Sequence, residues 1–138
     1  MTKAQPLDAP CVLALGGLDP SGGAGILADA RAIARAGAFP CAVATVLTVQ
    51  STRGLARVVP VRPALWSEQA RRVLSDQRVL AMKTGALGGA ASVRAACALA
   101  TPRIPLVVDP VMLPTRGRAR LLSPRALVAM RALVARAT

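Results

Sequence analysis

A glycine-rich stretch between an apolar run and an amphipathic run constrains this chain more than any other feature. Residues 11–15 are apolar, five glycines lie within residues 15–29, and apolar positions then recur with a helical period. The pattern predicts a strand followed by a helix over residues 22–36, with Ser21 as capping residue and Gly37 at the helix end. Glycines without a Cβ let a ligand approach the main chain, and a helix N-terminus suits an anion or an electron-rich oxygen. The stretch therefore predicts either a ligand-cradling loop or a tight structural turn, and it matches neither a P-loop nor the GxGxxG spacing.

The rest of the chain alternates strand and helix patterns. Strands are predicted at residues 41–48, 55–61, 79–83 and 104–109, and helices at residues 64–75, 90–100 and from Ser123-Pro124 to about Arg136. The nearly all-apolar run 41–48 is typical of a strand covered on both faces. Alternation of this kind predicts an α/β fold with a mostly parallel sheet, flanking helices and right-handed crossovers. Ligands bind at the carboxyl ends of such strands, and the long basic loop 113–122 follows one of those ends.

Composition argues against several function classes. The net charge of +12 invites a nucleic-acid interpretation, but the arginines are scattered, with one dense cluster at Arg116, Arg118 and Arg120, and aromatic residues make up 1% of the chain. A solvated basic surface that attracts phosphorylated substrates is favoured over specific nucleic-acid binding. The chain has no histidine, which argues against zinc and Ser-His-Asp chemistry.

The three cysteines and the N-terminal segment indicate the compartment. Cys11, Cys41 and Cys97 lie in apolar contexts without a CxxC pair, so we predict buried reduced thiols. Residues 1–10 are polar and predict a tail ahead of a domain at residues 11–138. No uninterrupted apolar run reaches the roughly 18 residues that a membrane helix needs, and the first such run is too short for a signal-peptide core. We therefore expect a cytoplasmic protein with no membrane partner.

Four motifs in a fixed order carry a resemblance to a known family. They are residues 18–29 (LDPSGGAGILAD), 45–52 (TVLTVQST), 82–87 (MKTGAL) and 107–112 (VVDPVM). The chain resembles the N-terminal half of the hydroxymethylpyrimidine/phosphomethylpyrimidine kinases of thiamine biosynthesis, in the ribokinase-like superfamily. The resemblance implies an incomplete ribokinase-like fold and ATP-dependent, Mg²⁺-assisted phosphorylation of 4-amino-5-hydroxymethyl-2-methylpyrimidine and its monophosphate. It also allows a homodimer for the full-length family members.

Gln50 is the principal candidate for substrate recognition. It follows the predicted strand 41–48 and is expected to point from the carboxyl edge of the sheet. Its amide offers an acceptor beside a donor, which matches a 4-aminopyrimidine with an exocyclic NH₂ next to a ring nitrogen, although a polar residue capping a strand is the alternative. The resemblance implies that Gln50 binds the pyrimidine and that Gly17, Asp19 and the backbone of Val111 contact it. Asp19 is equally compatible with a turn-forming aspartate.

Two charged residues, Asp109 and Lys83, are candidates for the phosphate side of the site, and a third, Asp29, is assigned a structural role. The resemblance implies that Asp109, at the end of a predicted strand, lies near the phosphate and metal region, where a carboxylate can help hold Mg²⁺. A structural aspartate at a strand end is the alternative. Lys83 can hold a phosphate as a point charge or pair with a carboxylate. Asp29 is expected to support the dipole of its own helix or to pair with Arg31 or Arg35.

The chain also departs from the family pattern. Ala86 stands where relatives carry a larger apolar residue, which predicts a more open pocket wall, and Leu18 replaces a small hydroxyl residue. Residues 115–120 replace a Lys-Ser-Gly-Asp type stretch, although three arginines there still favour an anion. Family members continue into a second half with the ATP site and a Gly-Thr-Gly-Cys or Gly-Thr-Gly-Asp motif, whose last residue activates the substrate hydroxyl. Nothing in this chain matches that motif, so it holds no predicted catalytic residue and is expected to be inactive alone.

Three alternative functions remain open from the sequence. A pyridoxal-type kinase fragment shares much of the motif pattern. A non-catalytic pyrimidine-binding module, working with a partner that supplies the missing half, would bind the pyrimidine without ATP turnover. A nucleic-acid binder would show steeply salt-dependent DNA affinity and no affinity for the pyrimidine.

Overall fold

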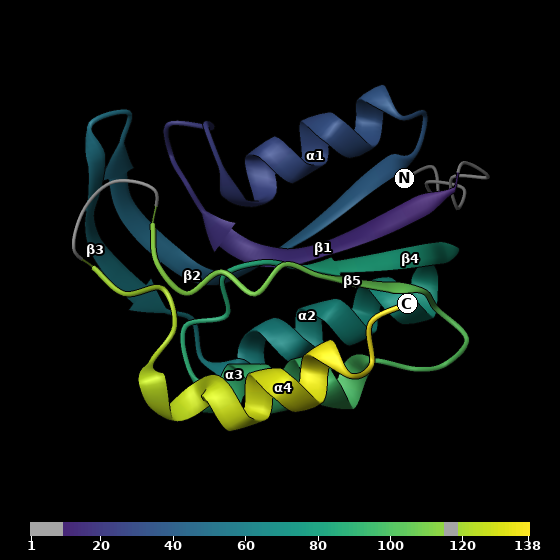
Figure 1. The fold of residues 1–138 in the computed structure, drawn as a ribbon. Coiled ribbons are helices and arrows are strands. Elements are labelled where there is room, and N and C mark those ends of the chain that lie inside the picture. Colours follow the sequence, from purple (N-terminus) through teal and green to yellow (C-terminus); the bar gives the residue numbers. More distant parts are fainter. Residues whose placement is uncertain (1–9, 115–118) are drawn as a thin grey trace.

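The computed structural model describes residues 10–114 and 119–138, which form a five-stranded sheet in the order β3-β2-β1-β4-β5 (Figure 1). The strands are β1 (Cys11–Leu18), β2 (Phe39–Ser51), β3 (Gly54–Pro60), β4 (Val79–Thr84) and β5 (Leu106–Val108). The pairs β1/β2, β1/β4 and β4/β5 are parallel, and β2/β3 is antiparallel. The predicted α/β fold with a mostly parallel sheet is confirmed.

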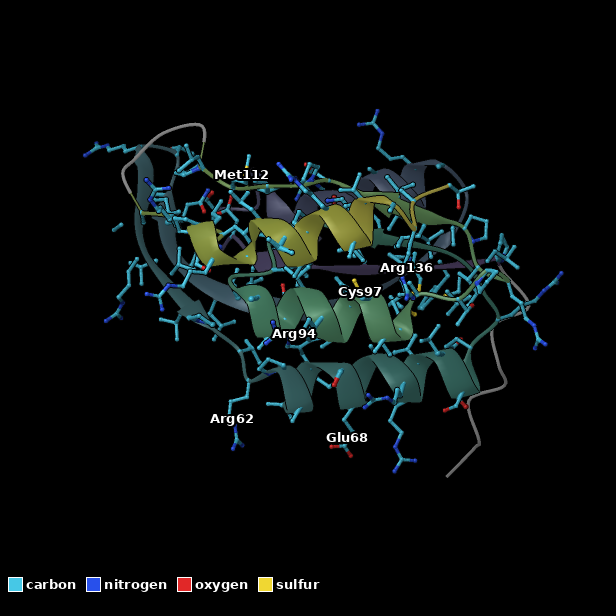
Figure 2. The ribbon with its side chains drawn as sticks, turned by 60° about the horizontal axis from the view of Figure 1, so that its bottom comes forward. Arg62, Glu68, Arg94, Cys97, Met112 and Arg136 are labelled. Atoms are coloured by element: carbon cyan, nitrogen blue, oxygen red, sulfur yellow. The ribbon has the colours of Figure 1, made fainter. Side chains whose placement is uncertain are left out.

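Helices cover the two faces of the sheet unequally. Helix α1 (Gly25–Arg35) lies on one face of the sheet (Figure 1). The other face carries α2 (Pro63–Asp76), α3 (Ala90–Leu99) and α4 (Leu127–Val134). A short 3₁₀ turn (Pro124–Ala126) leads directly into α4. The latter three helices form one layer (Figure 2). Arg136, just beyond α4, donates a hydrogen bond of 2.8 Å to the carbonyl oxygen of Cys97 on α3. The chain around α4 is therefore tied to the helix layer by a polar contact as well as by packing.

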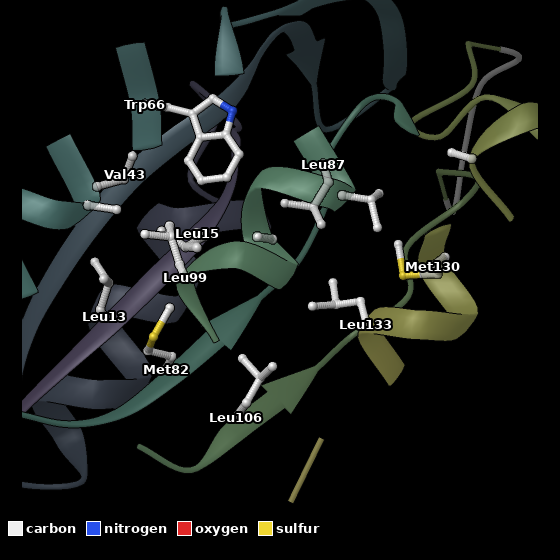
Figure 3. Close-up of a cluster of buried hydrophobic side chains, with 14 of the residues drawn as sticks. Leu13, Leu15, Val43, Trp66, Met82, Leu87, Leu99, Leu106, Met130 and Leu133 are labelled. Atoms are coloured by element: carbon white, nitrogen blue, oxygen red, sulfur yellow. The ribbon is translucent and has the colours of Figure 1, made fainter. Parts of the chain in front are cut away.

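The main core lies between the sheet and the three-helix layer. Figure 3 shows Leu13 and Leu15 of β1 and Met82 of β4 facing buried side chains that include Trp66 of α2 and Leu133 of α4. These five side chains are at most 1% exposed. Close packing of this kind holds the strands in fixed register, so the loops at their carboxyl ends start from defined positions.

Two sequence predictions about strand β2 are corrected. Strand β2 continues to Ser51, so Gln50 lies inside a strand and not after one; beyond Leu47 this strand pairs with β3 alone. The predicted covering of both faces of residues 41–48 is also wrong in part, because Leu47 is exposed at the end of the pairing with β1; Val49, where the β2/β3 hairpin projects past β1, is exposed as well. Pairing with β3 satisfies the backbone hydrogen bonds of this projecting segment, and this allows the strand to extend without a second layer over it.

The predicted helix start is also corrected. Helix α1 begins at Gly25 with Ala24 as the N-cap residue, and Ser21 does not cap it. The backbone N–H of Ala24 donates instead to the Asp19 carboxylate at 3.0 Å. Asp19 thus holds the residue that precedes the helix, and no described side chain caps the first turn of α1. Gly37 ends the helix with φ +84, as the sequence predicted.

The cysteines are free, but they are less uniformly buried than expected. Cys11 is buried, whereas Cys41 and Cys97 are of intermediate exposure. The Cys11 and Cys41 Sγ atoms on neighbouring strands lie 3.0 Å apart. Burial, together with the Cys41 contact, raises the pKa of the Cys11 thiol to about 12. Within the described ranges, no helix is long and apolar enough to cross a membrane.

Candidate functional site

One cavity at the carboxyl edge of the sheet collects all the residues that the sequence singled out as site candidates. It has a volume of about 570 Å³ and lies between the glycine loop after β1, the β2/β3 hairpin and the segments after β4 and β5. Its lining includes the six predicted residues, namely Gly17, Asp19, Gln50, Lys83, Asp109 and Val111. The carboxyl ends of neighbouring strands meet at this edge, which is why residues far apart in sequence converge here.

The loop between β1 and α1 is organised by the Asp19 side chain, which is 3% exposed. One carboxylate oxygen accepts hydrogen bonds from the backbone N–H of Ser21 at 2.9 Å and from its hydroxyl at 2.7 Å. The other accepts the N–H of Ala24 at the start of α1. Asp19 is thus a turn-forming aspartate, one of the two interpretations that the sequence allowed, and its carboxylate is committed to the loop.

The environment of Asp19 favours the charged carboxylate. Burial acts to raise its pKa, but the hydrogen bonds from Ser21, Ala24 and Gly23 outweigh burial, so the pKa lies below the ordinary value of 3.8. A carboxyl with a depressed pKa contributes stability that is present above the unfolded-state pKa and is lost as the pH falls through the folded-state pKa. The shape of the glycine loop is therefore coupled to pH only under acidic conditions.

Replacing Asp19 with alanine is expected to lower the free energy of unfolding by about 2–3 kcal/mol at pH 7, because the hydroxyl of Ser21 and the backbone N–H groups of Ser21 and Ala24 lose a charged acceptor. Urea unfolding of both proteins measures the difference, which should shrink as the pH falls below 3.8 and the wild-type carboxylate is neutralised. Ser21→Ala is the matched control, since it removes one donor and leaves the carboxylate paired with Ala24. An equal loss in both variants would contradict the role given to Asp19.

Gly25 and Gly17 let the glycine loop fold back against β1. Gly25 has φ +61, and a Cβ at this position would overlap the carbonyl oxygen of Gly17. At Gly17 a Cβ would lie 3.0 Å from Cγ2 of Val46 on β2. The cavity wall is therefore bare backbone where these segments meet, and a flat ligand can approach the main chain there.

The β2/β3 hairpin forms the opposite wall. The hydroxyl of Thr48 donates to the carbonyl oxygen of Leu18 at 2.8 Å, which ties the hairpin to the glycine loop. Gln50, two residues further along β2, is partly buried and lines the cavity. It pairs with Leu55 across the hairpin, next to a register shift between Val49 and Gln50. The Gln50 side chain therefore extends from a hydrogen-bonded β-hairpin. The backbone of such a hairpin is more restrained than that of a free loop.

An ion-pair cluster occupies the side of the cavity next to β4. Lys83 Nζ lies 3.0 and 2.9 Å from the two carboxylate oxygens of Asp29 and 3.8 Å from Asp109. Asp109 is the more exposed partner, with 55% of its side chain accessible against 20% for Asp29. Of the two roles that the sequence allowed for Lys83, the carboxylate pair is the one present. Three of the six acidic residues of a strongly basic chain thus line this cavity, namely Asp19, Asp29 and Asp109.

Asp29 is the site residue that sequence reasoning missed. The expected pairing with Arg31 or Arg35 is wrong: Asp29 contacts Lys83, and Arg31 donates instead to the carbonyl oxygen of Gly22. A signal was available, because Asp29 lies three residues after Ile26 and four before Ile33, on the apolar face of α1 that packs toward the sheet. A carboxylate on the inner face of a helix requires a partner from the sheet.

Ala86, Val111 and Leu121 line the apolar side of the cavity. Val46, Leu55, Ala86 and Leu121 form a small buried cluster, and Val111 packs against it. The hydroxyl of Thr45 donates to the carbonyl oxygen of Ala86 at 2.5 Å and fixes the segment after β4. Ala86 lines the cavity, where a larger side chain would take up space. In the basic loop, Arg116 and Arg118 fall outside the described residues, as does the predicted tail at residues 1–9.

The side chains that line the cavity determine how a divalent cation can bind there. Within residues 10–114 and 119–138, no three His, Cys, Asp or Glu side chains gather as metal ligands. Both carboxylate oxygens of Asp29 accept hydrogen bonds from Lys83. The more exposed Asp109 is therefore the carboxylate that is available to a cation. Mg²⁺ is commonly bound through one or two carboxylates together with substrate phosphate oxygens and water. The residues present fit that mode and do not form an all-protein cage.

Comparison with known proteins finds relatives along most of this chain. Residues 19–138 match the family model described as phosphomethylpyrimidine kinase. The hydroxymethylpyrimidine/phosphomethylpyrimidine kinase of Escherichia coli is 40% identical over 121 residues, covering 86% of this chain and 45% of that protein. The crystal structure of phosphomethylpyrimidine kinase from Clostridium difficile superposes with a TM-score of 0.77 at 30% identity, covering 88% of this chain and 53% of that one.

A pyridoxal kinase has a similar fold. The structure of the Staphylococcus aureus enzyme in complex with AMP-PCP and pyridoxal superposes with a TM-score of 0.77 at 27% identity, covering 94% of this chain and 46% of that one. The chain spans about half the length of these relatives.

Proposed function

The chain belongs to the phosphomethylpyrimidine kinase family of ribokinase-like proteins, and we propose that its cavity is the pyrimidine-binding half of a kinase site. The substrates would be 4-amino-5-hydroxymethyl-2-methylpyrimidine and its monophosphate, phosphorylated by ATP in thiamine diphosphate biosynthesis, with the cytoplasm as the expected location. The convergence of Gln50, bare glycine backbone and a lysine–aspartate cluster in one cavity carries the proposal. No single one of these features would distinguish a ligand site from a structural turn.

The pyrimidine ring would lie between the glycine loop and the β2/β3 hairpin. Gln50 would pair with the exocyclic amine and the adjacent ring nitrogen through its acceptor and donor. Gly17 would offer backbone at the ring face, and Val111 would contribute backbone and apolar contact. Asp19 would act on the substrate indirectly, because its carboxylate is already used to hold the loop. This division separates one recognising side chain from the groups that shape the pocket.

The hydroxymethyl group and its phosphate would face the charged cluster. Lys83, held by Asp29, would place a positive charge near the acceptor, and Asp109 would hold Mg²⁺ together with phosphate oxygens. When bound, ATP and Mg²⁺ supply the phosphoryl group and neutralise the charge that develops during its transfer. The residues that bind ATP and activate the hydroxyl are expected in the part of the relatives that this chain does not span, so turnover by this chain alone is expected to be negligible.

A pyridoxal-type kinase fragment is the second candidate, and the fold similarity to the Staphylococcus aureus enzyme favours it. Pyridoxal lacks an exocyclic amine next to its ring nitrogen, so it cannot form both hydrogen bonds with the Gln50 amide. A site that pairs with a substrate amine discriminates strongly against a ligand without one, because the site's own polar groups are then left unpaired.

Isothermal titration of the purified chain with each vitamin precursor tests the assignment. We expect the aminopyrimidine to bind and pyridoxal to bind at least about tenfold more weakly, which corresponds to about 1.4 kcal/mol. ATP hydrolysis should stay at the background level in the same preparation. Tighter binding of pyridoxal would favour the second candidate. Salt-dependent DNA binding without affinity for either precursor would reject both.

A further inference from the structure

The charged side chains that line the cavity carry a surplus of negative charge. Among the described residues of the lining, the charged ones are three aspartates, Asp19, Asp29 and Asp109, and one lysine, Lys83. The described lining contains no arginine, although the whole chain has a net charge of +12. A charged ligand therefore meets one sign of charge on approach to this protein and the opposite sign at the cavity wall.

Lys83 is already paired before any ligand arrives. Its Nζ lies 3.0 and 2.9 Å from the two carboxylate oxygens of Asp29 and 3.8 Å from a carboxylate oxygen of Asp109. This Asp29–Lys83–Asp109 cluster holds two carboxylates and one ammonium, so its net charge is negative. Asp109 presents that charge to a ligand, because 55% of its side chain is accessible against 20% for Asp29.

The two substrates of the proposed reaction differ in how they meet this cluster. A phosphate monoester carries about 1.5 to 2 negative charges at pH 7, so beside Asp109 it is repelled at close range. The arginines outside the cavity compensate this repulsion weakly, because salt screens exposed charges beyond about 8 Å at physiological ionic strength. A hydroxymethyl group is uncharged, and it can accept a hydrogen bond from Lys83 without bringing a second negative charge to the site.

We propose that the Asp29–Lys83–Asp109 cluster makes the cavity select the unphosphorylated aminopyrimidine and admit the monophosphate only together with a divalent cation. A cation between Asp109 and the phosphate oxygens would replace the repulsion by attraction, and Mg²⁺ is commonly held by one or two carboxylates together with substrate phosphate oxygens. The inference rests on the proposed function, since the aminopyrimidine has to occupy the cavity. It adds that the cation decides which of the two substrates this site binds.

Isothermal titration of the purified chain with the aminopyrimidine and with its monophosphate, each in EDTA and in excess Mg²⁺, tests this selection. In EDTA we expect the monophosphate to bind about tenfold or more weakly than the unphosphorylated ligand. Mg²⁺ should remove most of that difference and leave the affinity for the unphosphorylated ligand unchanged. Equal affinity for both ligands in EDTA would overturn the selection, leave the proposed function intact, and assign the phosphate to basic residues outside the cluster.

Asp109→Asn tests whether the charge of the cluster is the cause. The side chain of Asp109 is exposed and its contact with Lys83 is long, so the variant is expected to stay folded. In EDTA, the affinity for the monophosphate relative to that for the unphosphorylated ligand should rise about tenfold. The gain from Mg²⁺ should fall, because a carboxylate ligand is lost. An unchanged ratio in EDTA would contradict the role given to the cluster.

Glu68→Gln is the matched control, because it removes the same charge from an exposed position on α2 that does not line the cavity (Figure 2). Its affinity ratio and its response to Mg²⁺ should equal those of the wild type. A rise as large as that of Asp109→Asn would show that the net charge of the protein sets the selection, and would overturn the assignment to the cluster.

Discussion

Replacing Gln50 with leucine is expected to weaken aminopyrimidine binding by about a hundredfold while the fold remains intact. The substitution keeps the size of the side chain but removes both the acceptor and the donor, so the ligand's amine and ring nitrogen lose their partners on entering the cavity. Two lost hydrogen bonds of about 1.5 kcal/mol each account for this factor. Isothermal titration gives the affinity, and circular dichroism checks the fold. The β2/β3 pairing uses the backbone of Gln50 and is not affected by the side chain.

Two further variants make the Gln50 result specific. Gln50→Glu retains an acceptor at the same distance from the backbone and should bind the aminopyrimidine within about tenfold of the wild type. Val49→Leu changes the neighbouring residue, which is exposed and does not line the cavity, and should leave the affinity unchanged. Unaltered affinity in a folded Gln50→Leu protein would remove the basis for placing the pyrimidine beside the hairpin.

Replacing Gly25 with alanine is expected to destabilise the protein by about 3 kcal/mol or more. The residue has φ +61, which costs an L-residue about 1–2 kcal/mol, and the added Cβ would overlap the carbonyl oxygen of Gly17. Backbone atoms cannot turn aside as a flexible side chain can, so α1 or the end of β1 has to shift. Small domains have total stabilities of about 5–15 kcal/mol, and a loss of this size lowers the melting temperature by roughly 10 °C or more. Thermal and urea unfolding measure the effect.

Gly23→Ala in the same loop separates this effect from a general sensitivity of the loop. Its added Cβ would lie 3.6 Å from an Asp19 carboxylate oxygen and 3.7 Å from the Ser21 hydroxyl, which are ordinary contacts. Its φ is not in the positive region. We expect a change below about 1 kcal/mol. Equal destabilisation by both substitutions would show that the Gly17–Gly25 approach is not the cause.

Much of the fold and of the site's location is predictable from local patterns. Apolar periodicity predicts each strand and helix type, and the alternation of strands with helices predicts a parallel sheet with its ligand edge at the carboxyl ends. That rule predicts that Gln50 and Asp109 lie at the ligand edge of the sheet, because each comes at the end of an apolar run. Both line the cavity at that edge. Their contacts with a substrate stay predictions.

Partners remote in sequence are not predictable in this way. Lys83 and Asp29 are 54 residues apart and meet because β4 and α1 both pack against β1. The same limit explains the misassigned helix cap, since the reach of Asp19 to Ala24 depends on how the glycine loop folds back. The length of β2 was missed because β3 supplies its hydrogen-bond partners beyond β1.

The amino-acid order alone thus determines which segments are strands and helices and at which end of them polar side chains gather, because these properties depend on spacing within a few residues. Only the tertiary structure decides which charges neutralise each other, which carboxylate holds the loop, and how far β2 extends past β1. Those outcomes depend on register and packing between distant segments, and no local pattern encodes that register.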